Sequence, residues 1–229
     1  MTTIATTQKV LTEDLGKIFE MAICLCYNTS YDGNYKYSLQ EAQSLKNKLN
    51  NLKNLFPYNI KHCASRGSKY DFECLDDPTI HLSAKTTKKD GKVCPQVIGQ
   101  PSRKKFCEFF EIDPSTSLEQ IKLYIINNIA NLLHIYSVNT FDCPILYYNK
   151  HTNLMAFIVL NQHINWSNYA IKFSHNEKNK LWNESSSISI DGITIGEFQV
   201  HNKRDCIKFR WCFEKLLSMF EYYFTIRNL

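Results

Sequence analysis

The sequence lacks the features that mark several large classes of protein. None of its apolar runs approaches the length of a membrane-spanning helix, and its first residues lack the apolar core of a signal peptide. The nine cysteines form no C-x-x-C pair and no Cys/His set at zinc-site spacing. A P-loop, a glycine-rich dinucleotide fingerprint and a Ser/His/Asp arrangement are also missing. We therefore expect an intracellular, cytoplasmic protein with reduced cysteines and no membrane partner.

The composition describes a globular chain with a moderate positive charge. Its 229 residues are long enough for one sizeable core, 44% of them are hydrophobic, and 13% are aromatic. The formal net charge of +5 permits a nucleic-acid partner without requiring one. We find no repeats, no low-complexity segment and no convincing linker, so we expect a single domain over 1–229.

The stretch from Tyr70 to Lys85 carries the most specific chemical signal. Asp71 lies in a short aromatic run, and Lys85 ends a second run that alternates like a strand. The turn signal Asp76-Asp77-Pro78 separates the two runs, which predicts a hairpin or two adjacent strands. A carboxylate and an amine would then meet at one end of a sheet. Such a pair suits phosphodiester cleavage, in which the carboxylate holds Mg²⁺ and the amine orients or activates a water.

This stretch resembles the motif of the PD-(D/E)XK nucleases, and within them that of type II restriction endonucleases. The motif consists of an Asp, a gap of about a dozen residues, and then X-x-Lys at a strand end. The resemblance covers roughly residues 10 to 110. It implies a restriction-endonuclease-like core, Mg²⁺ as cofactor, and sequence-specific hydrolysis of double-stranded DNA by a homodimer that cuts a palindromic site. Asp71 would bind the metal and Lys85 would stabilise developing charge. Ser83 stands where the family has an acid two residues before the lysine.

Three other acids are candidates for the second metal-binding carboxylate. The resembled family often takes a glutamate from its first helix, and Glu20 lies at the edge of the apolar stripe of a helix that opens near Thr12. Glu73 points the same way as Asp71 on an extended strand. Glu108 lies on a short helix further along the chain. Glu20 is the first choice, and its alternative is an ordinary surface glutamate, whereas the alternative for Asp71 is a turn or strand-end salt bridge.

Two segments are candidates for DNA contact. A basic, irregular loop from Lys85 to Lys105 suits the phosphate backbone, whereas a predicted ribbon from Glu197 to Arg210, with Glu197, Gln199 and His201 on one strand face, suits base edges. A solvated loop and a solvated sheet face with cross-strand pairs are the alternatives. The candidate DNA-binding residues are Lys88, Lys89, Gln96, Gln100, Arg103, Lys104, Gln199, His201, Lys203, Arg204, Lys208 and Arg210.

The periodicity predicts an α/β or α+β fold with a mixed sheet and flanking helices. Catalytic core elements are expected in 10–140. They include a helix from 39 to Pro57 and a long buried helix after a capping box at Thr116. A β-rich part is expected in 141–229, closed by a helix from Phe213 to Phe224. Two other functions stay open. One is a structure-specific nuclease acting on a junction or on RNA, and the other is a catalytically inactive nucleic-acid-binding protein.

Overall fold

The structure is a computed structural model that describes residues 12–64, 68–89, 91–95, 102–177, 181–201, 203 and 205–229. The chain divides into two compact units. The first comprises Met1–Lys88, Leu146–Ala156 and Asn228–Leu229, and the second comprises Lys89–Ile145 and Phe157–Arg227. This division does not follow the expected parts 10–140 and 141–229, and the expectation of a single endonuclease domain stays a prediction.

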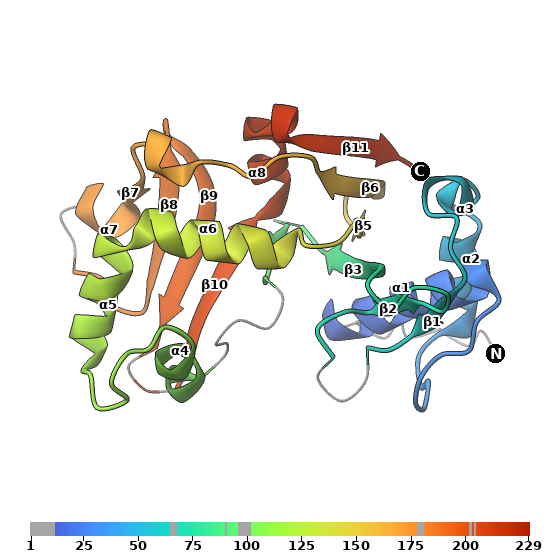
Figure 1. Cartoon of the computed structure of the whole chain (residues 1–229), viewed down its shortest axis with the longest axis horizontal. Coiled ribbons are helices and arrows are strands. Elements are labelled where there is room, and N and C mark those ends of the chain that lie inside the picture. Colours follow the sequence, from blue (N-terminus) through green and yellow to red (C-terminus); the bar gives the residue numbers. More distant parts are fainter. Residues whose placement is uncertain are drawn as a thin grey trace, which may run out of the picture. The chain divides into compact units, whose positions relative to one another are not determined.

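The first unit holds helices α1 (Thr12–Tyr27), α2 (Leu39–Lys46) and α3 (Leu52–Leu55) beside strands β1 (Ile60–His62), β2 (Phe72–Cys74) and β3 (His81–Thr87). Helix α1 packs on β1 and β3 (Figure 1). Its buried residues recur at helical spacing, as the sequence predicted: Leu15, Phe19, Ala22 and Ile23. The expected helix down to Pro57 is interrupted after Lys46, in an asparagine-rich segment that disfavours a continuous helix.

The first sheet has the strand order β1-β2-β3-β5-β6-β11, with β5 at Ile145–Asn149, β6 at Leu154–Leu160 and β11 at Phe224–Asn228. Strands β6 and β11 continue from one unit into the other. The expected hairpin around Asp76-Asp77-Pro78 is confirmed, because β2 and β3 pair antiparallel with Phe72 opposite Leu82. Five residues of β5 are buried in succession, as expected for a strand covered on both faces.

The second unit is built on a five-stranded sheet with the order β4-β10-β9-β8-β7. These strands are β4 (Lys92–Val93), β7 (Lys172–Phe173), β8 (Ser185–Ile190), β9 (Ile193–Val200) and β10 (Ile207–Cys212). The unit also holds helices α4 (Arg103–Phe109), α5 (Leu118–Asn127), α6 (Ile129–Thr140), α7 (Ser174–Glu177) and α8 (Phe213–Met219), with short 3-10 turns at Trp166–Asn168 and Glu221–Tyr223.

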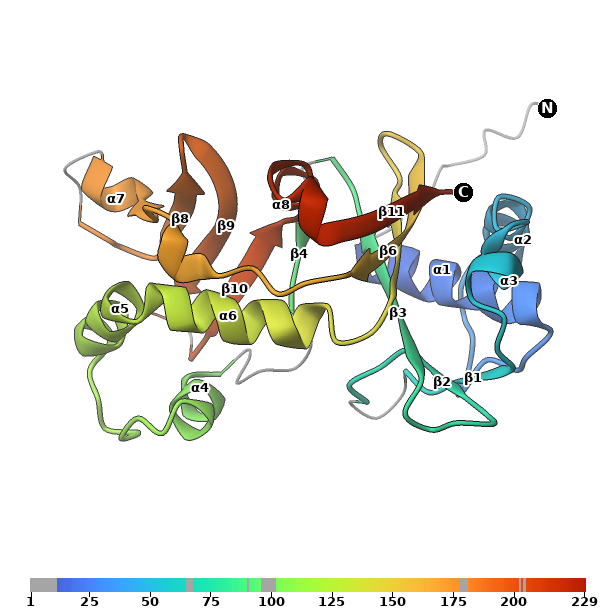
Figure 2. The ribbon, with the colours of Figure 1, turned by 45° about the horizontal axis from the view of Figure 1, so that its top comes forward.

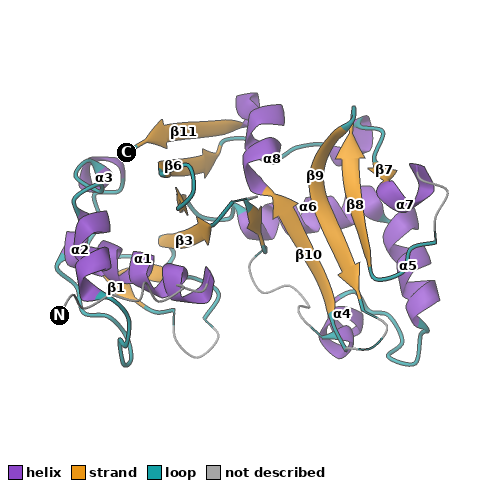
Figure 3. Cartoon of the chain, turned by 180° about the vertical axis from the view of Figure 1, so that it is seen from behind, coloured by secondary structure: helices purple, strands orange, loops and turns teal. Residues whose placement is uncertain are grey.

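Helix α6 covers one face of the β8–β10 sheet, in front of it in Figure 1 and behind it in Figure 3. The Tyr136 ring stacks on Phe209 at 4.7 Å between centroids, and Trp211 Nε1–H donates to Thr140 Oγ1 at 2.9 Å. The buried indole thus meets both an apolar neighbour and a hydrogen-bond acceptor. This aromatic layer forms the core of the second unit.

The β8–β9 hairpin follows the sequence closely, and Figure 2 shows it as a long curved ribbon. Asp191 and Gly192 both have positive φ, as the predicted two-residue turn requires. The expected bulge near Gly196 is confirmed by a register shift between Ile188 and Ser189, opposite Gly196. A Cβ atom at Gly196 would lie 2.7 Å from Phe209, so the ring packs directly on the bare backbone.

Three local expectations were wrong. The expected long helix is two helices separated at Asn128, whose side-chain amide donates to the Tyr124 carbonyl. The capping box lies one residue later than expected, on Ser117 and Gln120. The C-terminal helix stops at Met219, and Phe224 begins a strand.

The described helices include none that is long and apolar enough to cross a membrane. All nine cysteines are free thiols, and five of them are buried: Cys24, Cys74, Cys107, Cys143 and Cys212. Helices and two sheets occur together in the described residues, as the α+β expectation requires, although the sequence predicted one mixed sheet where the structure has two.

Candidate active site

The β2–β3 hairpin brings Asp71 and Lys85 together, as the sequence predicted. Asp71 directly precedes β2, and its Oδ2 atom accepts a hydrogen bond of 2.8 Å from the backbone N–H of Ala84 on β3. The ammonium of Lys85 lies 3.8 Å from the same oxygen. Both side chains are mostly buried, with 19% of Asp71 and 17% of Lys85 exposed. Strand β3 continues to Thr87, so Lys85 lies within the strand and not at its end.

Helix α1 contributes a second carboxylate to this place. The Glu20 side chain is only 8% exposed, so it is more deeply buried than the predicted position at the edge of the core. Its Oε2 atom lies 3.0 Å from Lys17 Nζ and 3.0 Å from His62 Nε2. The Tyr31 hydroxyl donates to the same oxygen at 3.4 Å. Glu20 is therefore held by groups from α1, β1 and the loop after α1.

Burial, more than the charges around it, sets the direction of the Asp71 pKa shift. Burial raises the pKa of Asp71 above its usual value, and the charge of Glu20 raises that pKa further. Lys85, the Ala84 N–H and Lys17 act in the opposite direction without overcoming the rise. The negative charge of Glu20 therefore disfavours ionisation of Asp71. A cation bound beside both groups would stabilise the ionised carboxylates.

The remaining acid candidates form ion pairs with other residues. Glu73 on β2 pairs with Lys61 Nζ at 2.7 Å, and that hydrogen bond lowers the Glu73 pKa. Glu108 belongs to the second unit, where it lies 3.8 Å from Lys104 one helical turn away. Ser83 is completely buried on β3 and supplies no carboxylate. Among the candidate acids, Glu20 is the one whose charge acts on Asp71.

Glu20 and Asp71 provide a donor set that fits Mg²⁺. The ion prefers hard oxygen ligands and is commonly bound by one or two carboxylates together with waters and substrate phosphates. Within the described residues, no group of three or more His, Cys, Asp or Glu side chains is arranged to hold a metal by itself. A pair of carboxylates agrees with a site whose other ligands are waters and phosphates, and not with a closed protein cage.

The candidate backbone-contacting residues have different surroundings. Arg103 donates to the carbonyls of Pro114 and Thr116, so its guanidinium fixes a neighbouring loop. Lys104 is 77% exposed. Lys88 lies at the end of the first unit and is half-buried, and Lys89 begins the second. Gln96 and Gln100 lie outside the described residues.

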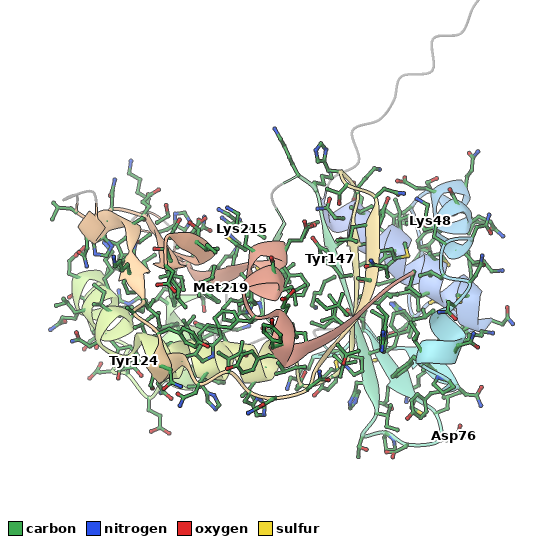
Figure 4. All side chains as sticks on the ribbon, turned by 90° about the horizontal axis from the view of Figure 1, so that it is seen from above. Lys48, Asp76, Tyr124, Tyr147, Lys215 and Met219 are labelled. Carbon is green, nitrogen blue, oxygen red and sulfur yellow. The ribbon has the colours of Figure 1, made fainter. Side chains whose placement is uncertain are left out.

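Lys89 is part of a basic cavity in the second unit. The cavity has a volume of about 370 Å³, and three lysines (Lys89, Lys92, Lys215) line it together with one acid, Glu214, and with Ser187 and Thr194. Lys215 lies on α8, where Figure 4 labels it together with Met219. Ammonium groups and hydroxyls are the side chains that contact phosphates in protein–DNA complexes.

The ribbon of β9 and β10 has a cross-strand ion pair, as its alternative interpretation expected, but the acid of that pair is buried and not solvated. Glu197 is 9% exposed and lies between Lys92 and Arg210, whose Nη2 is 2.9 Å from Glu197 Oε1. Gln199 also donates to that oxygen, at 2.9 Å. Burial acts to raise the Glu197 pKa, but the hydrogen bonds from Lys92 and Arg210 outweigh it and the pKa is lowered. The face is thus an ion-pair network that occupies donors of Gln199 and Arg210.

The other ribbon candidates lie nearer to solvent. His201 is 3.6 Å from Glu184, Lys203 is exposed and Lys208 is half-buried. Arg204 lies outside the described residues.

Sequence reasoning missed three residues of the cluster, Lys17, His62 and Tyr31. Lys17 could have been found, because a lysine three positions before Glu20 shares its helix face. His62 follows Ile60 at strand spacing, which indicates burial but not a partner. Nothing in the sequence places Tyr31, which lies in a loop, beside Glu20.

A comparison with characterised proteins finds that the chain is similar to a type II restriction enzyme. That relative is the type II restriction enzyme CviAII of Paramecium bursaria Chlorella virus 1, which is 44% identical over 221 residues. The match covers 96% of this chain, and the chain spans about 64% of the length of the relative. No family model matches the chain. No solved structure matches it either.

Proposed function

We propose that this chain is a Mg²⁺-dependent, sequence-specific endonuclease of double-stranded DNA, of the type II restriction enzyme kind. The observation that carries the proposal is the buried cluster in which Asp71 lies 3.8 Å from Lys85 and within the electrostatic reach of Glu20. The similarity to a type II restriction enzyme supports the same activity. A restriction-endonuclease-like core of the PD-(D/E)XK kind is part of the proposal, with Glu20 taking the place of the acid that Ser83 cannot supply.

The chain's own residues then have distinct roles. Asp71 and Glu20 would hold the ion, which supplies polarisation of the phosphate and a more acidic water when bound. The Lys85 ammonium, fixed beside Asp71, would stabilise the negative charge that develops on the phosphate oxygens. The Ala84 N–H holds Asp71 Oδ2, so the carboxylate is oriented before a substrate arrives.

DNA contact is assigned to both candidate segments. Lys88, Lys89 and Lys104 would contact phosphates, and the basic cavity lined by Lys92 and Lys215 extends this set. Lys203 and Lys208 of the ribbon remain available as base or phosphate contacts. Gln199 and Arg210 would read bases only by exchanging their bonds to Glu197, which adds a cost to that role. A palindromic site favours a homodimer.

A plasmid digest tests the proposal directly. Purified protein is incubated with supercoiled duplex DNA in Mg²⁺ or in EDTA, and the products are separated on a gel. We expect discrete bands in Mg²⁺ and intact plasmid in EDTA. A smear would indicate a nuclease without a defined site, and intact plasmid in both lanes would indicate an inactive binding protein.

A further inference from the structure

His62 is the most deeply buried titratable side chain beside the carboxylate cluster. It ends β1, and its side chain is only 1% exposed. The Tyr31 ring stacks on the imidazole at 4.3 Å between centroids with an interplanar angle of 26°. The Phe72 ring lies against it at 5.1 Å. These neighbours hold the plane of the imidazole, so its two nitrogens have fixed directions.

The hydrogen bonds of His62 define which nitrogen carries the proton. The backbone N–H of Asp32 donates to Nδ1 at 2.9 Å. A nitrogen that accepts from an N–H must present a lone pair, so Nδ1 is unprotonated. The proton of the imidazole is therefore on Nε2, which faces Glu20 Oε2 at 3.0 Å. His62 thus donates from Nε2 to Glu20, and a proton on Nδ1 would point at the Asp32 N–H.

This donor divides the two oxygens of Glu20 between different tasks. Oε2 accepts from His62, from Lys17 at 3.0 Å and from the Tyr31 hydroxyl at 3.4 Å. Within the described residues Oε1 accepts from Lys17 alone, at 3.3 Å. A carboxylate oxygen has two lone pairs, so Oε2 is fully used and Oε1 keeps acceptor capacity. The carboxylate cannot rotate without breaking its bond to the buried imidazole.

We propose that His62 is a positioning residue that holds Oε2 of Glu20 and thereby keeps Oε1 available to a divalent cation shared with Asp71. The role toward a cation rests on the proposed function, whereas the tautomer and the hydrogen bond do not. The reason to expect an effect is general: hydrogen-bond partners behind a ligand fix its orientation, and their loss typically lowers metal affinity about 10–100-fold.

The first test needs neither metal nor DNA. Nitrogen-15 NMR of the metal-free protein, labelled at histidine, reports the protonation of each imidazole nitrogen, and the His62→Gln variant assigns the signal. We expect a proton on Nε2 and an unprotonated Nδ1. A proton on Nδ1 overturns the proposal.

The second test uses two amides of different reach. The Gln side chain places an N–H₂ group near the position of Nε2, whereas the Asn side chain ends near the position of Nδ1 and cannot reach Glu20. Mn²⁺ binding is measured by the electron paramagnetic resonance of the free ion, in the presence of an uncleavable phosphorothioate duplex. We expect His62→Asn to weaken binding at least about tenfold and His62→Gln to stay within about threefold of the wild type.

Thermal unfolding of both variants separates positioning from folding. Equal loss of Mn²⁺ affinity in both variants, in step with equal loss of stability, would show that His62 supports only the fold and overturns the proposal. Unchanged affinity in His62→Asn also overturns it. If His62→Asn does not fold, Tyr31→Phe replaces it, because this change removes another donor to Oε2 but keeps the stacked ring, and we expect about a threefold weakening. A wild-type protein that binds no Mn²⁺ and cuts no DNA overturns the proposed function, and this outcome is distinct from a failure of the His62 variants alone.

Discussion

Each unit of the molecule contains a mostly buried carboxylate beside cations, Asp71 in the first and Glu197 in the second, and the pKa values of these two groups are shifted in opposite directions. The pKa of Asp71 in the first unit is raised by burial and by the charge of Glu20. The pKa of Glu197 in the second unit is lowered, since the hydrogen bonds from Lys92 and Arg210 outweigh burial. Two cations and an amide donate hydrogen bonds to Glu197, whereas Asp71 has a lysine at 3.8 Å and an acid within electrostatic reach.

This contrast separates a structural network from a site prepared for a ligand. A compensated carboxylate stabilises the fold and gains nothing from an added cation. A buried carboxylate whose pKa stays raised lowers the stability of the protein when it is ionised. A cation that binds beside it then stabilises the folded protein. Perturbed carboxylates gather at functional sites for this reason.

Removal of the Asp71 charge should have the largest effect on activity. We expect Asp71→Asn and Lys85→Ala each to lower the cleavage rate by about 10²-fold or more while leaving DNA binding measurable. The matched control is Glu197→Gln, which makes the same kind of change in the compensated network and should leave the rate within about threefold once folding is verified. Single-turnover digestion of a plasmid measures all three variants. Near-wild-type turnover in Asp71→Asn would show that the cluster is not the active site.

The identity of the second carboxylate can be tested in the same assay. We expect Glu20→Gln to reduce the rate by about 10²-fold, because its charge acts directly on Asp71. Glu73→Gln and Glu108→Gln should stay within about threefold, since Glu73 is held by Lys61 and Glu108 pairs with Lys104 on its own helix. A larger loss in either of these variants than in Glu20→Gln would transfer the role to that acid.

We expect Glu197 to contribute to the stability of the fold, whereas Asp71 contributes to DNA cleavage. Glu197→Gln leaves Lys92 and Arg210 without their anionic partner, which should lower the free energy of unfolding by about 1–3 kcal/mol at neutral pH. The folded-state pKa of Glu197 is lowered, so its contribution is present above the usual glutamate pKa and is lost as the pH falls through the folded value. Urea unfolding at several pH values measures both. A difference that does not shrink in acid would contradict this account.

The same contrast explains how much of the molecule the sequence could predict. The juxtaposition of Asp71 and Lys85 was predictable, because a turn signal between two short strands fixes a hairpin and therefore a local contact. The Ser38 cap and the Asp191-Gly192 turn were predictable for the same reason. Each depends on residues close together in the chain.

The partners of Glu20 and Glu197 could not be predicted in the same way. His62 lies 42 positions from Glu20, and Lys92 lies 105 positions from Glu197. Such contacts depend on how strands and helices pack, and the alternation of β9 places Glu197 on a polar face without showing that the face is covered. The sequence pattern therefore suggested DNA contact for Gln199 and Arg210. In the structure both side chains donate hydrogen bonds to the buried carboxylate of Glu197.

The smallest expected effect is on the stability of the first unit, and its sign is the informative part. Because the Asp71 pKa is raised in the folded state, the ionised carboxylate destabilises the protein at neutral pH. Asp71→Asn removes this charge and keeps an oxygen that can accept from the Ala84 N–H. We therefore expect the midpoint of thermal unfolding to rise by about 1–3 °C at neutral pH, as is typical when a functional-site charge is removed.

The pH dependence of that gain distinguishes it from a general packing effect. The stability of the wild type should fall as the pH rises from the usual aspartate pKa through the higher folded value, whereas Asp71→Asn should not show this fall. The extra stability of Asp71→Asn should therefore vanish in acid, where Asp71 of the wild type is protonated. The reduced stability of Glu197→Gln should also vanish in acid, so the two variants differ from the wild type in opposite directions only at higher pH. Added Mg²⁺ should stabilise the wild type and not Asp71→Asn, because only the wild type retains both carboxylates. A lower unfolding midpoint for Asp71→Asn at neutral pH would mean that Lys85 and Lys17 already compensate Asp71, and the two carboxylates would then be alike.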